Sequence, residues 1–144
     1  MIIFRSLFTT FFLAFAMLTT GCASTTEQSL YDEIGGHDTL NTIYGVAITR
    51  IYNDPTIGHY FKGVPKRHLR EQLVSQTCDL IGGPCEYDGK TMIESHKGLN
   101  IQERDFYILV EYVQSAMRDV GLTYQQESKI LQKLAPLKTD TVYL

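Results

Sequence analysis

The chain has 144 residues, with 13 Lys or Arg against 16 Asp or Glu and a formal net charge of −3 at pH 7. This slightly acidic balance argues against a protein that binds nucleic acid through its phosphates. Hydrophobic residues make up 44% of the chain, which is enough for the core of one domain without a structural metal.

The first 21 residues have the order of a secretory signal peptide. Arg5 precedes the apolar run from Leu7 to Leu18, and small residues follow. A helix needs about 20 apolar residues to span a bilayer core, so this run is too short for a permanent anchor. We therefore expect export to the periplasm, and we treat residues 29–144 as the folded domain.

The segment from Leu18 to Cys22 resembles the lipobox of bacterial lipoproteins, in which the cysteine is acylated and becomes the mature N-terminus. The leucine lies four places before Cys22, whereas the usual pattern has it three places before. We expect a lipid on Cys22, a tether over 22–28 and a membrane-anchored protein. The alternative is cleavage near Ala23, which releases a soluble periplasmic protein.

Two further cysteines, Cys78 and Cys85, flank a Gly-Gly-Pro turn. The turn can bring their side chains together, and disulfides persist in the periplasm. We expect a disulfide between them. The alternative is a pair of free thiols.

Helical periodicity runs through the whole domain. Apolar residues recur at spacings of three and four, as in Leu40, Ile43, Ala47 and Ile51, and no stretch alternates with period two. The sequence therefore predicts an all-α fold. The sequence predicts a very short helix from Ser29 to Gly35, a helix over 38–52 and a short helical segment over 55–61. Longer helices are predicted over 66–81, 101–120 and 124–137, with an irregular loop over 84–92 between the first two of these.

Capping residues mark the expected helix starts. Ser29 with Asp32, Asn100 with Glu103 and Thr123 with Gln126 have the spacing of capping boxes, and Asp38 is placed to cap the second helix. The long helices form two pairs, 38–52 with 66–81 and 101–120 with 124–137. One pair can pack on the other as a layer, with space between them for a flat apolar ligand.

Residues that carry chemistry are few. The four histidines include no close pair at metal-ligand spacing, and the chain has no glycine-rich phosphate loop and no nucleophile beside a base. These observations argue against a zinc site and against hydrolysis. His96 differs from the other histidines because it lies between an apolar turn and Gly98, just before the longest apolar helix.

Several motifs resemble group I truncated haemoglobins. Residues 29–37 (SLYDEIGGH) resemble that family's first-helix signature, 80–89 (LIGGPCEYDG) its second Gly-Gly turn and 92–96 (MIESH) its proximal-histidine segment, and 134–137 (LAPL) also matches. The similarity runs from residue 29 to about 142 without a gap. It implies a two-over-two helical sandwich around haem b, with His96 as the proximal iron ligand.

The resemblance also implies the rest of the haem pocket. Phe61 takes the position of a phenylalanine that stacks on the haem, and Lys66, Arg67, Arg70 and Lys97 are candidates to pair with the haem propionates. The residues expected to contact the cofactor are Phe61, Leu69, Leu73, Met92, His96, Ile101, Phe106, Leu109 and Leu134.

The distal side departs from the family pattern. Many relatives have a tyrosine that donates a hydrogen bond to bound O2 where this chain has Ile48, and the two facing positions fall on Leu69 and Leu73. Polar candidates nearby are Gln72 and Gln76. Gln72 takes a position where some relatives have a distal histidine, so its amide is the favoured donor. We expect weak distal stabilisation and fast ligand escape.

The function implied by the resemblance is reversible binding of O2, NO or CO, supported by an unidentified reductant. One alternative is a haem enzyme that converts O2 and NO to nitrate or acts weakly on peroxide, although the sequence supplies no clear distal acid or base for peroxide cleavage. A haem-free helical lipoprotein that retains the scaffold is the third interpretation.

Overall fold

The computed structural model describes residues 28–144, and the predicted signal peptide and Cys22 lie outside the described residues. The elements are α1 (Leu30–Glu33), α2 (Gly36–Asn53), η1 (Gly58–Phe61), α3 (Lys66–Leu80), α4 (Met92–His96), α5 (Glu103–Asp119), α6 (Tyr124–Leu134) and η2 (Ala135–Lys138), where η denotes a 3-10 helix. Residues 28–144 include no strand, and the all-α prediction is confirmed. Within the same residues, no helix is both long and apolar enough to cross a membrane.

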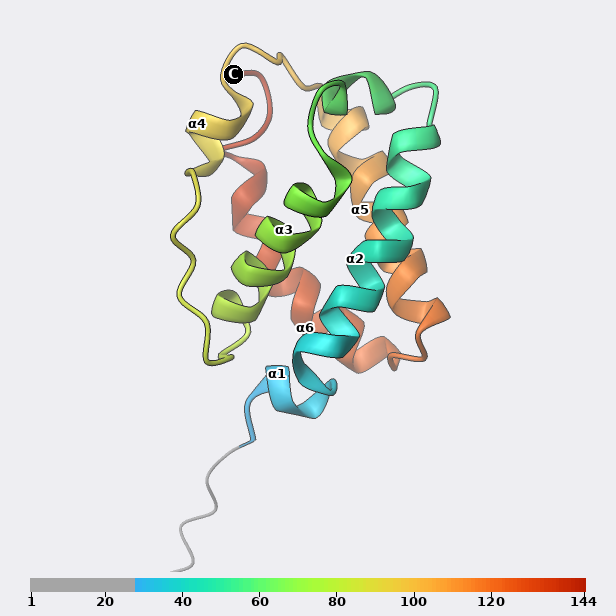
Figure 1. Cartoon of the computed structure of the whole chain (residues 1–144), viewed down its shortest axis with the longest axis vertical. Helices are drawn as coiled ribbons and strands as arrows, with labels where there is room; N and C mark the ends of the chain where they lie inside the picture. The colour runs from blue at the N-terminus through green and yellow to red at the C-terminus, as the bar shows by residue number, and fades with distance from the viewer. Residues whose placement is uncertain (1–27) are drawn as a thin grey trace, which may run out of the picture.

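The helices form two layers (Figure 1). Helices α2 and α3 lie in front in this view, and α5 and α6 lie behind them. Helix α2 packs extensively on both α3 and α5, and α6 contacts both α3 and α5. The core therefore centres on α2, whose residues Leu40, Ile43, Ala47 and Ile51 form one buried stripe. A helical spacing of three and four places these side chains on one face.

Two predicted helix starts are wrong. Helix α2 begins at Gly36 and not after Asp38, because Gly35 and Gly36 both adopt positive φ and turn the chain directly into the helix. Helix α5 begins at Glu103 after Gln102. Asn100 cannot cap it, because its backbone is left-handed at φ 48°.

Other helix ends follow the sequence signals more closely. Thr123 and Gln126 form the predicted capping box at the start of α6. The α-helix ends at Leu134 and not at 137, because Pro136 interrupts its hydrogen bonding, and the chain continues as the 3-10 helix η2. Ser29 caps α1 by accepting a hydrogen bond from the Asp32 amide.

The loop predicted over 84–92 leads into a short helix, α4, which helical periodicity did not predict. Thr91 and Glu94 form a reciprocal capping box that starts α4. The Thr-x-x-Glu spacing that signals such a box is present in the sequence. The following apolar run is too short to reveal the helix by its periodicity.

Two buried hydroxyl groups join α2 to α3. Tyr44 and Thr77 are both buried and share a hydrogen bond between their side-chain oxygens. Burial raises the pKa of the Tyr44 phenol to about 12, so the group stays neutral at physiological pH. A neutral, hydrogen-bonded pair avoids the free-energy cost of an unpaired polar group in the core.

A buried carboxylate joins α5 to α6. Glu127 is 2% exposed, and its oxygens accept hydrogen bonds from the Arg118 guanidinium at 2.7 and 2.9 Å and from the Gln114 amide at 3.1 Å. The hydrogen bonds from Arg118 hold the pKa of Glu127 below its usual value. The charge is therefore compensated where it is buried.

The substitution Tyr44→Phe should lower the free energy of unfolding by about 1–2 kcal/mol, because the Thr77 hydroxyl would remain buried without a partner. The double variant Tyr44→Phe/Thr77→Val removes both hydroxyls and should recover most of that loss. Urea denaturation followed by far-UV circular dichroism measures both values. A double variant less stable than the single variant would contradict this account.

Candidate functional site

His96 is the last residue of α4, and its ring orientation is set by a backbone group. Its Nδ1 lies 2.7 Å from the carbonyl oxygen of Met92, and the side chain is half-buried. Because a carbonyl oxygen only accepts, Nδ1 carries the proton and donates it. In the neutral ring, Nε2 then presents the lone pair, which is the arrangement of a metal-ligating imidazole.

The apolar residues predicted around His96 differ from ordinary core residues in their burial. Ile43 and Ile51 in the core are 1% exposed, whereas most of the predicted pocket residues are only half-buried. These half-buried residues are Phe61, Leu69, Leu73, Met92, Phe106, Leu109 and Leu134, and Ile101 is buried. Because these large apolar side chains are half-buried, part of the surface of each is not covered by the helices.

The structure divides these residues into two groups. Phe61, Leu69, Leu73, Leu109 and Leu134 pack against the edge of the main core. Met92, Ile101 and Phe106 lie outside that cluster, at α4 and the start of α5. No helix within residues 28–144 packs extensively on α4. We name the region between these two groups of apolar residues the slot, with His96 on its α4 side.

The two glutamines expected on the distal side take different directions. The Gln72 side-chain oxygen lies against Gly89 in the loop before α4, where an added Cβ on Gly89 would come within 2.3 Å of it. Gln76 is 9% exposed, and its Nε2 lies 3.9 Å from the Met92 sulfur. Gln76 therefore contacts α4 through Met92, while Gln72 as the donor on the distal side stays a prediction. Ile48 is buried in the core at 2% exposure.

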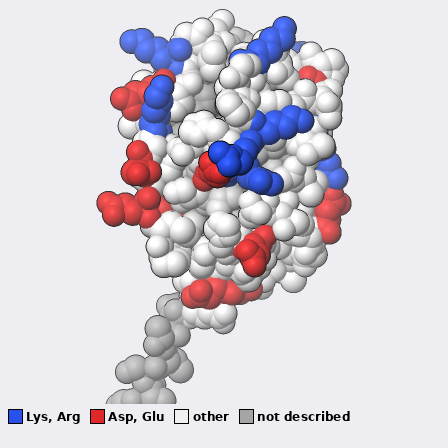
Figure 2. All heavy atoms as spheres, viewed as in Figure 1, with Lys and Arg blue, Asp and Glu red and all other residues white. Residues whose placement is uncertain are grey.

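Most of the cations expected to pair with the propionates have other contacts in the structure. Figure 2 shows basic side chains mainly in the upper half of the viewed face, while acidic ones lie mostly along its left edge and lower half. Lys66 lies over the Tyr52 ring, and Arg67 pairs with Glu71. Arg70 reaches toward α2, within 3.6 Å of where a Cβ on Gly45 would be. Lys97 is exposed and directly follows His96.

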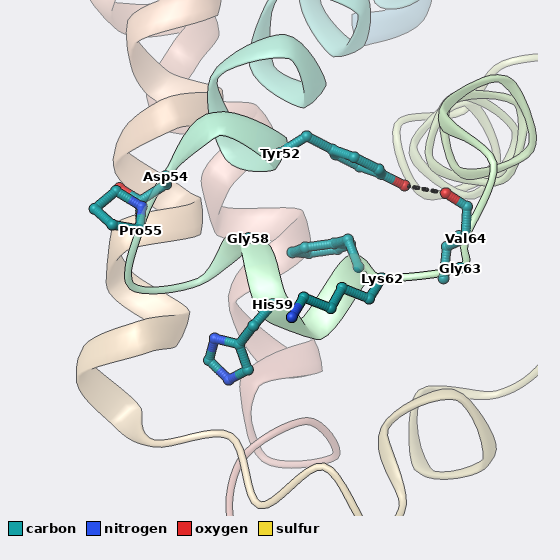
Figure 3. Close-up of a pocket in the computed structure, with 9 residues that line it drawn as sticks. Tyr52, Asp54, Pro55, Gly58, His59, Lys62, Gly63 and Val64 are labelled. Carbon is teal, nitrogen blue, oxygen red and sulfur yellow. Dashed lines mark hydrogen bonds between the residues drawn. The ribbon is translucent and has the colours of Figure 1, made fainter.

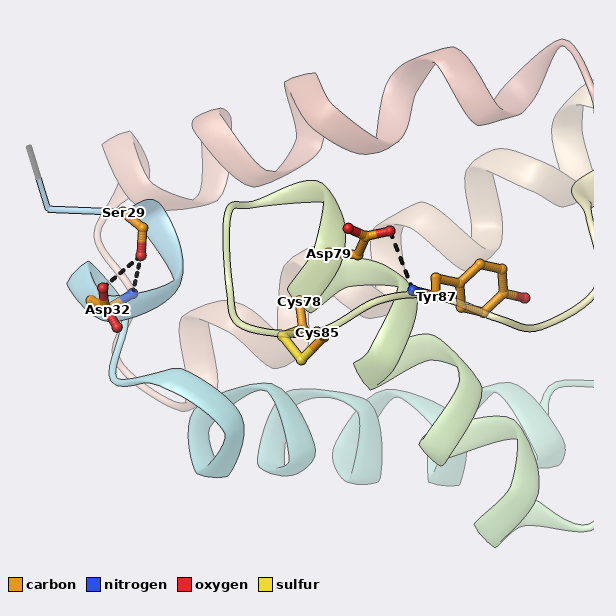
Figure 4. Close-up of a disulfide and its surroundings, with 6 residues drawn as sticks. All are labelled: Ser29, Asp32, Cys78, Asp79, Cys85 and Tyr87. Carbon is orange, nitrogen blue, oxygen red and sulfur yellow. Dashed lines mark hydrogen bonds between the residues drawn. A yellow bond between two sulfur atoms is a disulfide. The ribbon is translucent and has the colours of Figure 1, made fainter.

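A disulfide attaches the loop before α4 to α3. Cys78 at the end of α3 and Cys85 in the loop are bonded, with their Cα atoms 5.8 Å apart (Figure 4). Beyond it, the Tyr87 amide donates to the Asp79 carboxylate at 3.4 Å, and the Tyr87 hydroxyl donates to the Lys90 carbonyl at 2.8 Å. The loop that leads into α4 is thus attached to the end of α3.

Two tyrosine–carboxylate hydrogen bonds position η1, which carries Phe61. The Tyr60 hydroxyl donates to buried Asp105 of α5 at 2.8 Å, and the Tyr112 hydroxyl of α5 donates to Asp54 at 2.7 Å. The Tyr112 hydroxyl and nearby backbone amides lower the pKa of Asp54. Sequence reasoning did not identify these pairs, because partners 45 and 58 residues apart leave no local pattern.

A surface hollow of about 480 Å³ lies on the outside of η1. Its lining includes His59, Lys62 and Phe61, and the Tyr52 hydroxyl crosses it to donate to the Val64 carbonyl at 2.7 Å (Figure 3). A second hollow of about 490 Å³ lies between α2 and α5, around Tyr112. Neither hollow is lined by His96, although Phe61 borders both the first hollow and the slot.

The comparison with protein families identifies the fold and its cofactor. A model described as bacterial-like globin matches residues 29–143, which is nearly the whole described chain. The chain belongs to this globin family. Haem is the cofactor of the family's truncated haemoglobins, and the residues at the slot fit it: His96 presents a nitrogen lone pair, and the half-buried side chains supply apolar walls.

Named relatives of this globin are group 1 truncated haemoglobins. One from Tetrahymena pyriformis is 29% identical over 96 residues, which cover 67% of this chain and 79% of the relative. One from Mycolicibacterium paratuberculosis is 29% identical over 112 residues, which cover 78% of this chain and 82% of the relative. The predicted group of globins is supported by these names.

Solved structures share the fold. The Fe(III) form of a truncated haemoglobin from Tetrahymena pyriformis superposes with a TM-score of 0.77 at 25% identity, and the match covers 81% of this globin and 100% of that chain. A 2/2 haemoglobin from a Synechococcus species, with covalently attached haem, gives a TM-score of 0.74 at 12% identity, covering 80% and 98% of the two chains. The predicted two-over-two architecture is confirmed.

The variant Cys85→Ala should lose about 2–3 kcal/mol of unfolding free energy, the contribution expected from a disulfide that closes a short loop. It leaves the buried Cys78 side chain in place, so core packing is preserved. Dithiothreitol should destabilise the wild type by the same amount and leave the variant unchanged, as measured by urea denaturation. A wild-type unfolding midpoint that does not respond to dithiothreitol would show that the two thiols are free.

Proposed function

We propose that this globin holds haem b through His96 and reversibly binds a small diatomic gas on the opposite side of the haem. The observation that carries the proposal is the hydrogen bond from His96 Nδ1 to the Met92 carbonyl. It directs the unprotonated Nε2 away from the helix backbone, as a proximal ligand requires. The half-buried apolar side chains on both sides of the slot support the same assignment.

Haem iron, when bound, supplies the coordination position at which O2, NO or CO binds. The chain's own residues orient the imidazole, exclude water from the slot and define the polarity of the distal side. Leu69 and Leu73 on α3 and buried Ile48 on α2 offer no hydrogen-bond donor. The Gln76 amide, which lies 3.9 Å from the Met92 sulfur of α4, and the Gln72 amide are the candidate donors.

This distribution of polarity favours weak retention of the gas. One amide hydrogen bond contributes roughly 0.5–1.5 kcal/mol, which corresponds to at most about tenfold in affinity. Aliphatic side chains on the distal side contribute no such bond. We therefore infer fast ligand escape and a role in binding or delivering gas rather than storing it tightly.

The substitution His96→Gly should abolish the Soret band of the purified protein supplied with haem. Added imidazole should restore it, because a free imidazole can take the place of the deleted ring. The control is His37→Ala, an exposed histidine at the opposite end of the domain, which should bind haem like the wild type. Absorption spectra of the ferric, ferrous and CO-bound forms provide the readout.

Two outcomes would contradict the assignment. A wild-type protein that remains colourless with excess haem would favour the haem-free interpretation. A His96→Gly variant that binds haem with wild-type affinity and without imidazole would move the iron ligand to another residue.

We also propose export through the N-terminal signal and acylation of Cys22, which tether the globin to a membrane in the periplasm. The support is the order of residues 1–21 and the lipobox-like segment that ends at Cys22. The polar residues that follow Cys22 suit a tether, since such segments do not form a packed core.

The substitution Cys22→Ser should move the protein from the membrane fraction to the soluble fraction and remove the acyl mass from its N-terminal peptide. The control Ser24→Ala should behave like the wild type, because it leaves the acceptor cysteine intact. Cell fractionation measures the first effect, and mass spectrometry of the N-terminal peptide measures the second. A wild-type protein found soluble, with its N-terminus near Ala23, would show ordinary cleavage instead.

A further inference from the structure

The C-terminal end of the chain pairs through its backbone with the connector that follows His96. Gly98 and Asn100 both donate their amides to the Leu144 carbonyl, at 3.2 and 2.9 Å, and Tyr143 donates its amide to the Ile101 carbonyl at 3.0 Å. Figure 1 shows the end of the chain beside α4. Residues 141–144 and 98–101 thus form a small non-helical pairing, which we name the C-terminal clamp.

The backbone of the clamp adopts specific and unusual conformations. Asn100 and Tyr143, at φ 48° and 58°, are the non-glycine residues with positive φ in the described part of the chain. Such conformations cost free energy and persist where surrounding contacts compensate for it. Both segments of the clamp also include a buried residue, Ile101 on one and Thr141 on the other.

The segment that precedes the clamp is attached to α5. Lys138, at the end of η2, forms an ion pair with Glu103 and donates to the Tyr107 hydroxyl at 3.0 Å. Thr141 donates its hydroxyl to the Leu137 carbonyl at 2.7 Å. The C-terminal segment is therefore connected to α5 before it reaches the connector.

Helix α4 needs this support because it has few other contacts. It is only five residues long, and no helix within residues 28–144 packs extensively on it. An isolated helix of one turn is unstable in water. On its N-terminal side it is restrained by the loop that carries Cys85, and on its C-terminal side the connector begins directly after His96.

We propose that the C-terminal clamp is a positioning device for His96. By holding residues 98–101, it sets where α4 ends and so where the His96 ring lies in the slot. The effect on haem rests on the proposed function, whereas the backbone pairing is a property of the protein with or without the cofactor. Residues 143 and 144 would therefore influence haem retention without contacting haem.

The test compares Tyr143→Pro with Tyr143→Gly in the full chain. Proline removes the amide that donates to Ile101 and cannot adopt positive φ, whereas glycine keeps the amide and adopts positive φ readily. The Tyr143 side chain is 60% exposed, so both variants lose little packing. They differ mainly in the backbone pairing.

In the haem-loaded protein, Tyr143→Pro should increase the rate of haem transfer to apomyoglobin by about tenfold, the effect expected from one lost backbone hydrogen bond at its upper limit. It should also shift or broaden the iron–histidine stretching band in the resonance Raman spectrum of the ferrous form. Tyr143→Gly should remain within about twofold of the wild type. Far-UV circular dichroism should be the same for all three proteins.

In the haem-free protein, amide hydrogen exchange at Asn100 should accelerate in Tyr143→Pro and not in Tyr143→Gly. This measurement separates the two proposals, because it tests the pairing even if the wild type binds no haem. Wild-type rates of exchange and haem transfer in the proline variant would overturn the clamp. Equal effects of proline and glycine would also overturn it, since the side chain rather than the backbone pairing would then be responsible.

Discussion

The hydrogen bond from His96 Nδ1 to the Met92 carbonyl is the interaction on which the site depends. Both residues belong to a helix of a single turn, which lacks the length to be stable alone. The Thr91–Glu94 capping box satisfies amides at its start, so the Met92 carbonyl is held where the imidazole can reach it. The orientation of the His96 ring thus depends on whether α4 is folded.

The rest of the fold supplies a rigid body against which that helix is placed. Helices α2, α3 and α5 share the main core, and the apolar residues at its edge form one side of the slot. Helix α4 forms part of the other side and is restrained mainly through the chain segments on either side of it. The Cys78–Cys85 disulfide attaches the preceding loop, and the C-terminal clamp attaches the following connector.

Several buried polar groups are paired with side chains from other elements. Tyr44 pairs with Thr77, Glu127 with Arg118 and Asp105 with Tyr60. Tyr44–Thr77 and Tyr60–Asp105 join segments 33 and 45 residues apart, and Arg118–Glu127 joins the successive helices α5 and α6. The pairs therefore help to specify how the helices pack. Under the proposed function, the distal side is formed by aliphatic residues and a glutamine amide. This composition suits exchange of a small neutral gas, because few such groups can retain it.

The sequence by itself determined the long helices, their order and the family, because spacings of three and four and local motifs such as SLYDEIGGH are properties of neighbouring residues. It also singled out His96 from its position between an apolar turn and a glycine, and the Thr123–Gln126 cap from its spacing. Only the tertiary structure decided that Gln76 contacts Met92 of α4, that Tyr60 and Tyr112 hold η1 through carboxylates, and that the C-terminal residues pair with the connector after His96. These features depend on contacts between residues far apart in the chain, and such contacts leave no periodic signal because their geometry exists only after the helices have packed.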